Sequence, residues 1–228
     1  MTDEERNRMA ARLAAWLNEW RLDHMLRATM EGPELLSAPP LTSRRSRPTA
    51  IRVRDLVLLH PSATPSCDRP LHVAVLGRRR GGLRWVAPFS RFSTPASNGE
   101  WRTGRSAMPL RVLALWNARW IPPRTFANGW VVGRFTERER RAAREVWEAW
   151  RHGRPPPSRL RDDVGPPVVH PDDPRRLYEE EEARIMDEAA AGDESKLFCL
   201  SEEPFPYGIP DAERLKAAEE EEPDAPRP

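Results

Sequence analysis

The sequence predicts a mainly β fold: a small curled β domain with a closing helix, an N-terminal amphipathic helix and a partly disordered acidic C-terminal tail. Three observations lead to this prediction. Short runs rich in Val, Leu and Trp follow one another between Ile51 and Phe135, each bounded by Pro, Gly or Asn, as β-strands are. Apolar residues recur at helical spacing before and directly after this region. From residue 153 onward the chain is rich in proline and then in acidic residues, a composition that buries little apolar surface.

The first predicted element is the amphipathic helix, within residues 1–30. Thr2 and Glu5 have the spacing of a capping box at its start. The apolar stripe consists of Met9, Leu13, Trp16, Leu17, Trp20 and Met25 or Leu26. A stripe that contains two tryptophans must be covered, either by the β domain, which we expect, or by a partner. Residues 31–50, with their prolines and serines, are typical of a linker.

The predicted β domain and its closing helix span residues 51–152. The sequence GRRRGG, between Leu76 and Leu83, joins two apolar runs and predicts a hairpin with arginines at its tip. Thr136 followed by Glu139 forms a second capping box, which predicts the start of the closing helix. One face of this helix carries Ala142, Ala143, Val146, Trp147 and Trp150. We expect that face to pack on the strands.

The C-terminal extension comprises residues 153–228. Its first part, GRPPPSRLRDDVGPPVVHPDDP, cannot sustain regular structure because its prolines remove hydrogen-bond donors and restrict their neighbours. Leu177 to Ala191 is a candidate charged helix, and Asp211 to Ala218 is a shorter candidate. The segment KLFCLSEEPFPYGIP, which lies between them, contains aromatic residues that indicate docking on another surface.

Charge is distributed unevenly along the chain. Residues 51–154 contain 20 basic and 7 acidic side chains, whereas residues 155–228 contain 9 and 21. Nearly all of the basic residues are arginines. A GC-rich coding bias would explain arginine in place of lysine, but not the scarcity of acids in the middle segment. A basic block of this size favours a polyanionic partner such as RNA, because each neutralised phosphate releases condensed counterions.

Several other classes of protein are disfavoured. The two cysteines, Cys67 and Cys199, lie far apart and the five histidines are scattered, so we predict neither a disulfide framework nor a metal site, and no cofactor. GRRRGG lacks the helical pattern that follows a phosphate-binding loop. No apolar run approaches the roughly 18 residues that predict a membrane span. We therefore expect a cytoplasmic protein without membrane association.

Four motifs, in order along the chain, resemble the PemK/MazF family of toxin-like proteins. They are a first strand that ends in a proline loop (RVRDLVLLHPSATPSCDRP), Arg-Pro before an apolar strand (RPLHVAVL), a strand that runs into proline and a hydroxyl (WVAPFSRFSTP), and GRFTERERRAAREVWEAW. The resemblance covers about Arg52 to Trp150. It implies an SH3-like barrel, a homodimer, and a toxin-type, metal-independent endoribonuclease that cuts single-stranded RNA and leaves a cyclic phosphate.

The resemblance also implies site residues. By motif position, Arg69 matches the family's catalytic arginine, and Ser90 matches the hydroxyl residue that helps to hold the scissile phosphate. A guanidinium suits this role because its planar fork matches phosphate oxygens, although arginine is a poor general base. Further contacts with RNA are expected from Arg91, Ser93, Thr94 and His60.

Two departures from the family pattern support an alternative prediction. The family's Gly-Asp is replaced by Arg54-Asp55, and a serine stands where threonine is commoner. The alternative is a non-catalytic SH3-like barrel that binds a nucleic acid or a protein partner. In either case, an antitoxin or the chain's own acidic C-terminal tail, with the segment Leu197 to Pro210, is expected to shield the basic face.

Overall fold

The computed structural model of the chain describes residues 3–29, 51–67, 69, 71–106, 110–127 and 129–191. Thr2 of the first predicted capping box, the linker at 31–50 and the aromatic segment Leu197 to Pro210 lie outside the described residues. The α-helices of the described part are α1 (Asp3–Thr29), α2 (Glu137–Arg151) and α3 (Arg175–Ala191). Its short 3-10 helices are η1 (Pro61–Ala63), η2 (Arg80–Gly82), η3 (Leu115–Asn117), η4 (Pro123–Phe126) and η5 (Ser158–Asp163).

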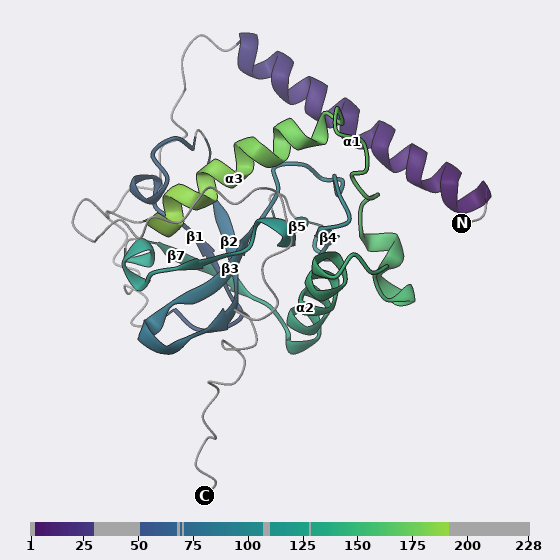
Figure 1. The fold of residues 1–228 in the computed structure, drawn as a ribbon. Helices are drawn as coiled ribbons and strands as arrows, with labels where there is room; N and C mark the ends of the chain where they lie inside the picture. The colour runs from purple at the N-terminus through teal and green to yellow at the C-terminus, as the bar shows by residue number, and fades with distance from the viewer. Residues whose placement is uncertain are drawn as a thin grey trace, which may run out of the picture. The chain divides into compact units, whose positions relative to one another are not determined.

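The strands of the described residues form two antiparallel sheets (Figure 1). They are β1 (Asp55–Leu58), β2 (His72–Arg78), β3 (Arg84–Pro88), β4 (Glu100–Arg102), β5 (Val112–Ala114), β6 (Arg119–Ile121) and β7 (Trp130–Arg134). The larger sheet has the strand order β6-β3-β2-β1-β7, and the smaller pairs β4 with β5. A bridge between Phe89 and Leu113 connects the end of β3 to β5, so the chain after β3 passes from one sheet to the other.

Alternation of side chains along β1, β2 and β3 makes both faces of the larger sheet apolar. One face contributes Leu56, Ala74, Leu76 and Ala87 to a cluster with Ala142, Ala143 and Val146 of α2. The opposite face contributes Val57, Val73, Val75 and Val86 to a cluster with Ile185, Met186 and Ala189 of α3. Each face of the sheet is therefore covered by its own helix, α2 or α3.

The start of α3 is set by Asp173 and Pro174, which precede its first residue. The carboxylate of Asp173 accepts a hydrogen bond from the backbone N–H of Arg175 at 3.0 Å, which satisfies one of the donors that a helix start leaves unpaired. The Arg175 side chain is buried and donates to the carbonyl oxygens of Ala96 and Pro166. These bonds attach the start of α3 to the loop that follows β3.

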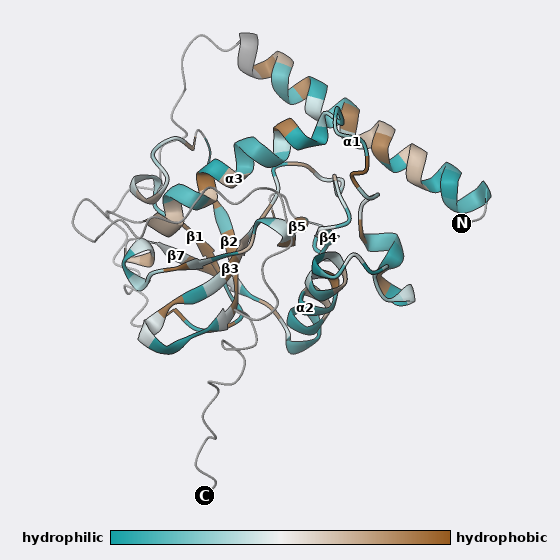
Figure 2. Cartoon of the chain, in the orientation of Figure 1, coloured by the Kyte–Doolittle hydropathy of each residue, from teal (hydrophilic) through white to brown (hydrophobic). Residues whose placement is uncertain are grey.

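Helix α1 packs through one fully buried residue, Trp16, whose ring contacts Phe92 and Tyr178. Leu13, Leu17 and Trp20 of the predicted stripe are partly buried against the same group. Figure 2 shows hydrophobic residues at intervals along α1 and α3, between hydrophilic ones, as one-sided packing requires. The N-terminal helix thus covers the loop after β3 and the first turns of α3.

Two local predictions are confirmed by the structure, whereas the proline-rich segment after residue 152, predicted to lack regular structure, contains the 3-10 helix η5. The hairpin at GRRRGG joins β2 to β3, and the capping box of Thr136 and Glu139 begins α2. The predicted charged helix is α3, which begins two residues earlier than expected. None of the helices in the described ranges combines the length and the apolar character that a membrane crossing requires.

The predicted fold class needs correction, because the described residues are not mainly β. The three α-helices contain 27, 15 and 17 residues, whereas each strand contains between 3 and 7. The fold mixes helices with antiparallel sheet, and in the described part of the chain β6 and β7 end the larger sheet without closing it into a barrel. The prediction gave the helices too little weight in the fold. The sequence of α3 is highly charged, so it did not indicate that this helix would cover one whole face of the sheet.

Candidate anion-binding site beneath α3

The two residues that motif position singled out lie at the same end of the larger sheet. Arg69 precedes β2 and Ser90 follows β3, and these strands are antiparallel neighbours. The pairing continues past the end of β3, where the N–H of Phe89 donates to the carbonyl of His72 at 2.8 Å. The register therefore places the loop with Arg69 beside the loop with Ser90, and α3 lies over both.

Arg69 is paired with a carboxylate of α3. Its Nη2 donates to Oε2 of Glu182 at 2.5 Å, and only 17% of the Arg69 side chain and 3% of the Glu182 side chain are exposed. Burial opposes the charged form of Arg69, but the nearby Glu182 carboxylate favours it, and the net effect is a raised pKa. Arg69 is thus a fixed cation in this structure, the opposite of what a proton acceptor needs.

A second guanidinium approaches the same carboxylate. Nε of Arg91 lies 3.9 Å from Oε1 of Glu182, and its Nη2 donates to Oε2 of Glu181 at 3.2 Å. The Arg91 side chain is 7% exposed and also lies 3.5 Å from Oδ2 of Asp23 in α1. The Glu182 carboxylate therefore lies between two arginines, as a phosphate group would in the predicted site.

Ser90 is buried, and its hydroxyl is bonded on both sides. Its Oγ lies 2.9 Å from the hydroxyl of Tyr178 and accepts a hydrogen bond from the N–H of Phe92 at 3.1 Å. The Tyr178 hydroxyl donates its only proton to Oε1 of Glu100 at 2.9 Å, so Ser90 must be the donor to Tyr178. Burial, and the negative charges of Glu100 and Glu182, raise the pKa of Tyr178 and keep that proton in place.

Glu100 is a buried carboxylate at the base of this network. It accepts hydrogen bonds from the N–H of Ala96 at 2.6 Å and from Nε1 of Trp116 at 3.2 Å, in addition to the one from Tyr178. Burial raises the pKa of Glu100 to about 7, although these three donors oppose the rise. The network links β4, the loop after β3 and α3 through hydrogen-bonded side chains.

Ser93 and Thr94, the next hydroxyl residues of the motif, are bonded to α1. Oε1 of Glu19 accepts from the hydroxyls of both residues at 2.7 Å, and Oε2 accepts from the N–H of Ser93 at 2.6 Å. All of the motif's polar residues expected to contact phosphate are therefore matched by carboxylates or by Tyr178.

His60 lies apart from this cluster in its contacts. Its ring caps η1 through Ser62, and the centroid of the ring lies 5.9 Å from that of Trp130. No contact between His60 and Arg69, Ser90 or Arg91 is found in the described ranges. Five of the six predicted site residues therefore lie in the neighbouring loops before β2 and after β3, whereas His60 caps the short helix η1.

Sequence reasoning missed the residues that fill the site, namely Tyr178, Glu182, Glu100, Glu19 and Asp23. A signal for two of them exists, because Tyr178 and Glu182 share the helical spacing of the buried residues Ile185, Met186 and Ala189. A glutamate on the apolar face of a helix requires a cation beneath it.

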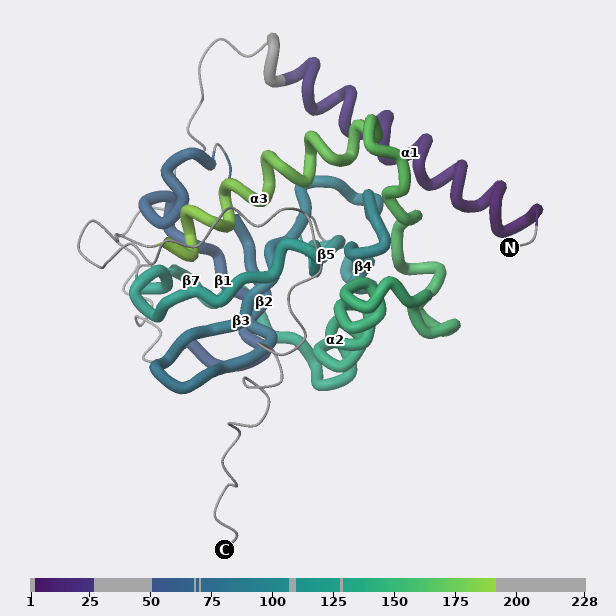
Figure 3. Tube along the Cα trace, in the orientation of Figure 1, coloured from purple at the N-terminus to yellow at the C-terminus, as the bar shows by residue number. Residues whose placement is uncertain are grey.

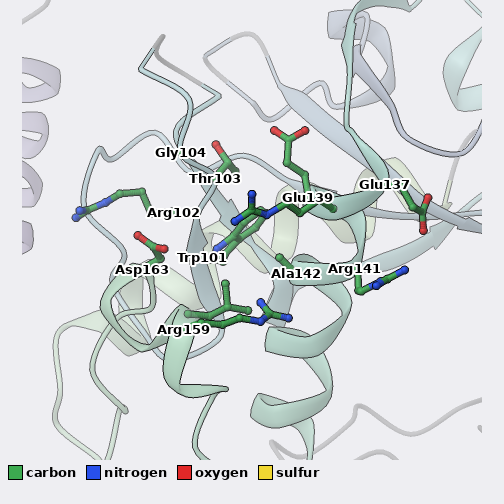
Figure 4. A pocket seen from close by; sticks show the side chains of 12 residues that line it. Trp101, Arg102, Thr103, Gly104, Glu137, Glu139, Arg141, Ala142, Arg159 and Asp163 are labelled. Carbon is green, nitrogen blue, oxygen red and sulfur yellow. The ribbon is translucent and has the colours of Figure 1, made fainter.

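A surface cavity of about 730 Å³ lies elsewhere, between β4, the first turns of α2 and η5 (Figure 4). Figure 4 shows Arg102, Arg141 and Arg159 around it together with Glu137, Glu139 and Asp163. Glu139 is engaged by the capping box and by Arg105, and Glu137 by Arg140. None of the residues implied by the family resemblance lines this cavity. The described residues contain no group of side chains arranged to hold a metal ion.

Comparisons with known proteins give no match to a family model, to a curated protein or to a solved structure. The resemblance to the PemK/MazF family therefore rests on the four motifs alone and stays a prediction.

Proposed function

We propose that the chain is a non-catalytic nucleic-acid-binding protein with a core of the SH3-like, PemK/MazF-like type, in which α3 fills the position of the family's nuclease site. One observation carries this proposal: the Glu182 carboxylate lies between Arg69 and Arg91, one helical turn after Tyr178, whose hydroxyl is bonded to Ser90. The two arginines already hold an anion, and that anion belongs to the chain itself.

The chemistry of RNA cleavage supports the non-catalytic assignment. Attack by the 2′-hydroxyl requires an acceptor for its proton and donors aimed at the developing phosphorane. Arg69 is held as a cation by Glu182, and the Ser90 hydroxyl donates to Tyr178. Ser90 is 1% exposed, so a phosphate could reach it only after α3 had moved.

The packing of α3 opposes such movement. Tyr178, Ile185 and Met186 are each buried to more than nine-tenths against the rest of the molecule. Burial of side chains of this size contributes about 1.5–3 kcal/mol each. Detachment of α3 would lose this contribution from all three, which the entropy regained by the freed segment offsets only in part.

A second candidate function is the metal-independent endoribonuclease of the family resemblance. It is favoured by the convergence of Arg69, Ser90 and Arg91, which the sequence motifs anticipated. In that case α3, part of the acidic extension, acts as the cis shield, and an antitoxin-like partner or a homodimer contact would have to displace it. Both candidates imply a cytoplasmic protein that meets RNA.

The experiment that separates them uses the full chain, a long single-stranded RNA and EDTA. We expect salt-dependent binding in a gel-shift assay, no shortening of the RNA, and no cyclic phosphate ends. Cleavage that disappears in Arg69→Lys and Ser90→Ala variants, with circular dichroism showing that both remain folded, would establish the nuclease instead. Failure of the full chain to bind RNA at low salt would refute both candidates.

A further inference from the structure

The tip of the β2–β3 hairpin carries arginines that no carboxylate of the described residues neutralises. Arg78, Arg79 and Arg80 are exposed, and in the described part of the chain none of them has an acidic partner. By contrast, Arg69, Arg91, Arg105, Arg119 and Arg134 each form an ion pair with a carboxylate. Part of the basic charge of residues 51–154 is therefore neutralised within the chain, whereas the hairpin arginines have no acidic partner among the described residues.

The register of the hairpin brings two like charges together. Arg78 on β2 pairs directly with Arg84 on β3. Arg84 donates to the carbonyl oxygens of Ile51 and Gly82 and not to a carboxylate, and its pKa is lowered by burial and by the charge of Arg78. Like charges at directly opposite positions destabilise an antiparallel pair, so this arrangement calls for a functional explanation.

The turn that holds these arginines is closed by backbone hydrogen bonds. The N–H of Arg79 donates to the carbonyl of Leu83 at 3.1 Å, and the N–H of Gly82 donates to the carbonyl of Arg79 at 3.2 Å. Gly81 and Gly82 have φ angles of 79° and 83°, a left-handed conformation that glycine adopts without strain. The glycines thus fix the turn, and the arginine side chains extend from a defined backbone.

An exposed aromatic ring lies beside the same strand end. Trp120 on β6 pairs with Trp85 on β3, and 36% of Trp120 is exposed. The turn itself approaches the chain just after β6, because a Cβ added to Gly82 would lie 2.9 Å from Cγ of Pro123. Side-chain alternation puts Trp120 on the α2 face of the sheet with Trp85, and Arg78 and Arg84 on the α3 face with Ile121. The surface that we call the hairpin patch therefore consists of Arg79, Arg80 and Trp120.

We propose that the hairpin patch binds single-stranded nucleic acid, with the guanidinium groups on backbone phosphates and Trp120 stacked on a base. This inference rests on the proposed function and locates its binding surface. Proteins that bind single-stranded nucleic acid combine basic side chains, which contact the phosphates, with exposed aromatic rings, which stack on the unpaired bases. An acidic peptide would use the arginines but has no need of the indole.

The patch is separate from the site beneath α3. β2 contains 7 residues, which at about 3.3 Å per residue puts its two ends about 20 Å apart. Figure 3 shows the β2–β3 hairpin on the side of the trace away from α1. Binding at the patch therefore does not involve Arg69 or Ser90.

The test measures fluorescence anisotropy of labelled 20-nucleotide RNA and DNA strands, with polyglutamate of similar length as competitor, on the full chain. The variants are Arg79→Gln/Arg80→Gln and Trp120→Leu. The matched control is Arg138→Gln/Arg141→Gln, which removes the same charge from two exposed arginines of α2. Thermal melting checks that each variant is folded.

We expect Arg79→Gln/Arg80→Gln to weaken binding at least tenfold, and to lower the dependence of log K on log salt by about 1.4, because about 0.7 counterions per phosphate contact are released from single strands. Trp120→Leu should weaken binding about fivefold with little change in that slope. The control should change binding less than twofold. Tighter binding of RNA than of DNA would identify contacts to the 2′-hydroxyl, and equal binding would identify backbone recognition; both agree with the proposal.

Three results would overturn it. If the full chain binds neither strand, the proposed function fails, and the patch with it. If the chain binds but the hairpin and control variants weaken equally, the proposed function survives and the hairpin patch is wrong. If polyglutamate competes as well as RNA does, and Trp120→Leu has no effect, the surface recognises charge alone.

Discussion

The two ends of the β2–β3 ladder carry the same kind of side chain in opposite electrostatic settings. At the end beneath α3, Arg69 and Arg91 are largely shielded from solvent and matched by Glu181, Glu182 and Asp23. At the hairpin end, Arg78 to Arg80 are exposed and unmatched in the described part of the chain. The comparison teaches that a basic sequence becomes a basic surface only where the fold brings no acid to it. Arginines at the first end hold the fold together, and those at the second are available to a partner.

The largest expected effect is a loss of stability on removal of the Arg69–Glu182 ion pair beneath α3. Arg69→Ala leaves the Glu182 carboxylate buried beside Arg91 alone, and removal of one partner of a buried pair typically costs about 3–5 kcal/mol. The free energy of unfolding from urea titration measures this loss. Arg79→Ala at the hairpin is the matched control and should change stability by less than about 0.5 kcal/mol. A similar loss in both variants would show that the two ends do not differ as described, whereas partial recovery in Arg69→Ala/Glu182→Ala would identify the pair as the cause.

An intermediate effect comes from the pH dependence of the network beneath α3. Burial raises the pKa of Glu100 from 4.5 to about 7, so the folded chain binds its proton more tightly than the unfolded chain does. The free energy of unfolding should therefore fall as pH rises through the window between these two values, by roughly 2–3 kcal/mol from this group. Urea titrations at pH 5 and pH 8 measure the change, and Glu100→Gln should reduce it. Equal pH dependence in the variant would mean that Glu100 is ionised throughout, or that Glu179, whose pKa burial also raises to about 7, is responsible.

The smallest expected effect is a gain in stability, and it comes from a substitution at the hairpin. Arg78→Glu replaces a like-charge pair with an opposite-charge pair across from Arg84, and should raise the free energy of unfolding by about 0.5 kcal/mol. Thermal melting at low salt detects the gain, which should disappear in high salt. The same variant should bind RNA less tightly. A destabilised Arg78→Glu would mean that the arginines support the turn, and the distinction between the two ends would then weaken.

Features that depend on neighbours in sequence could be predicted. The hairpin follows from glycines flanking arginines, and the start of α2 follows from Thr136 and Glu139, because the interactions that determine both span only a few residues. The clustering of Arg69, Ser90 and Arg91 also followed, from motif order. The sequence did not predict that α3 would fill this site, because Glu182 is 113 positions from Arg69 and Tyr178 is 88 positions from Ser90. Whether an arginine faces solvent or a carboxylate depends on such long-range packing, and neither composition nor periodicity specifies it.

The position of α3 along the chain has a consequence for synthesis on the ribosome. Ser90 leaves the ribosome long before Tyr178, its hydrogen-bond partner 88 residues later. At about 5–20 residues per second, that interval lasts roughly 4–18 seconds. Throughout it, the apolar face of the sheet that α3 covers is open to water, and Arg69 and Arg91 lack the carboxylates of α3. The nascent chain thus presents a basic, half-built sheet to its surroundings, including the RNA of the ribosome itself, until its last described helix emerges.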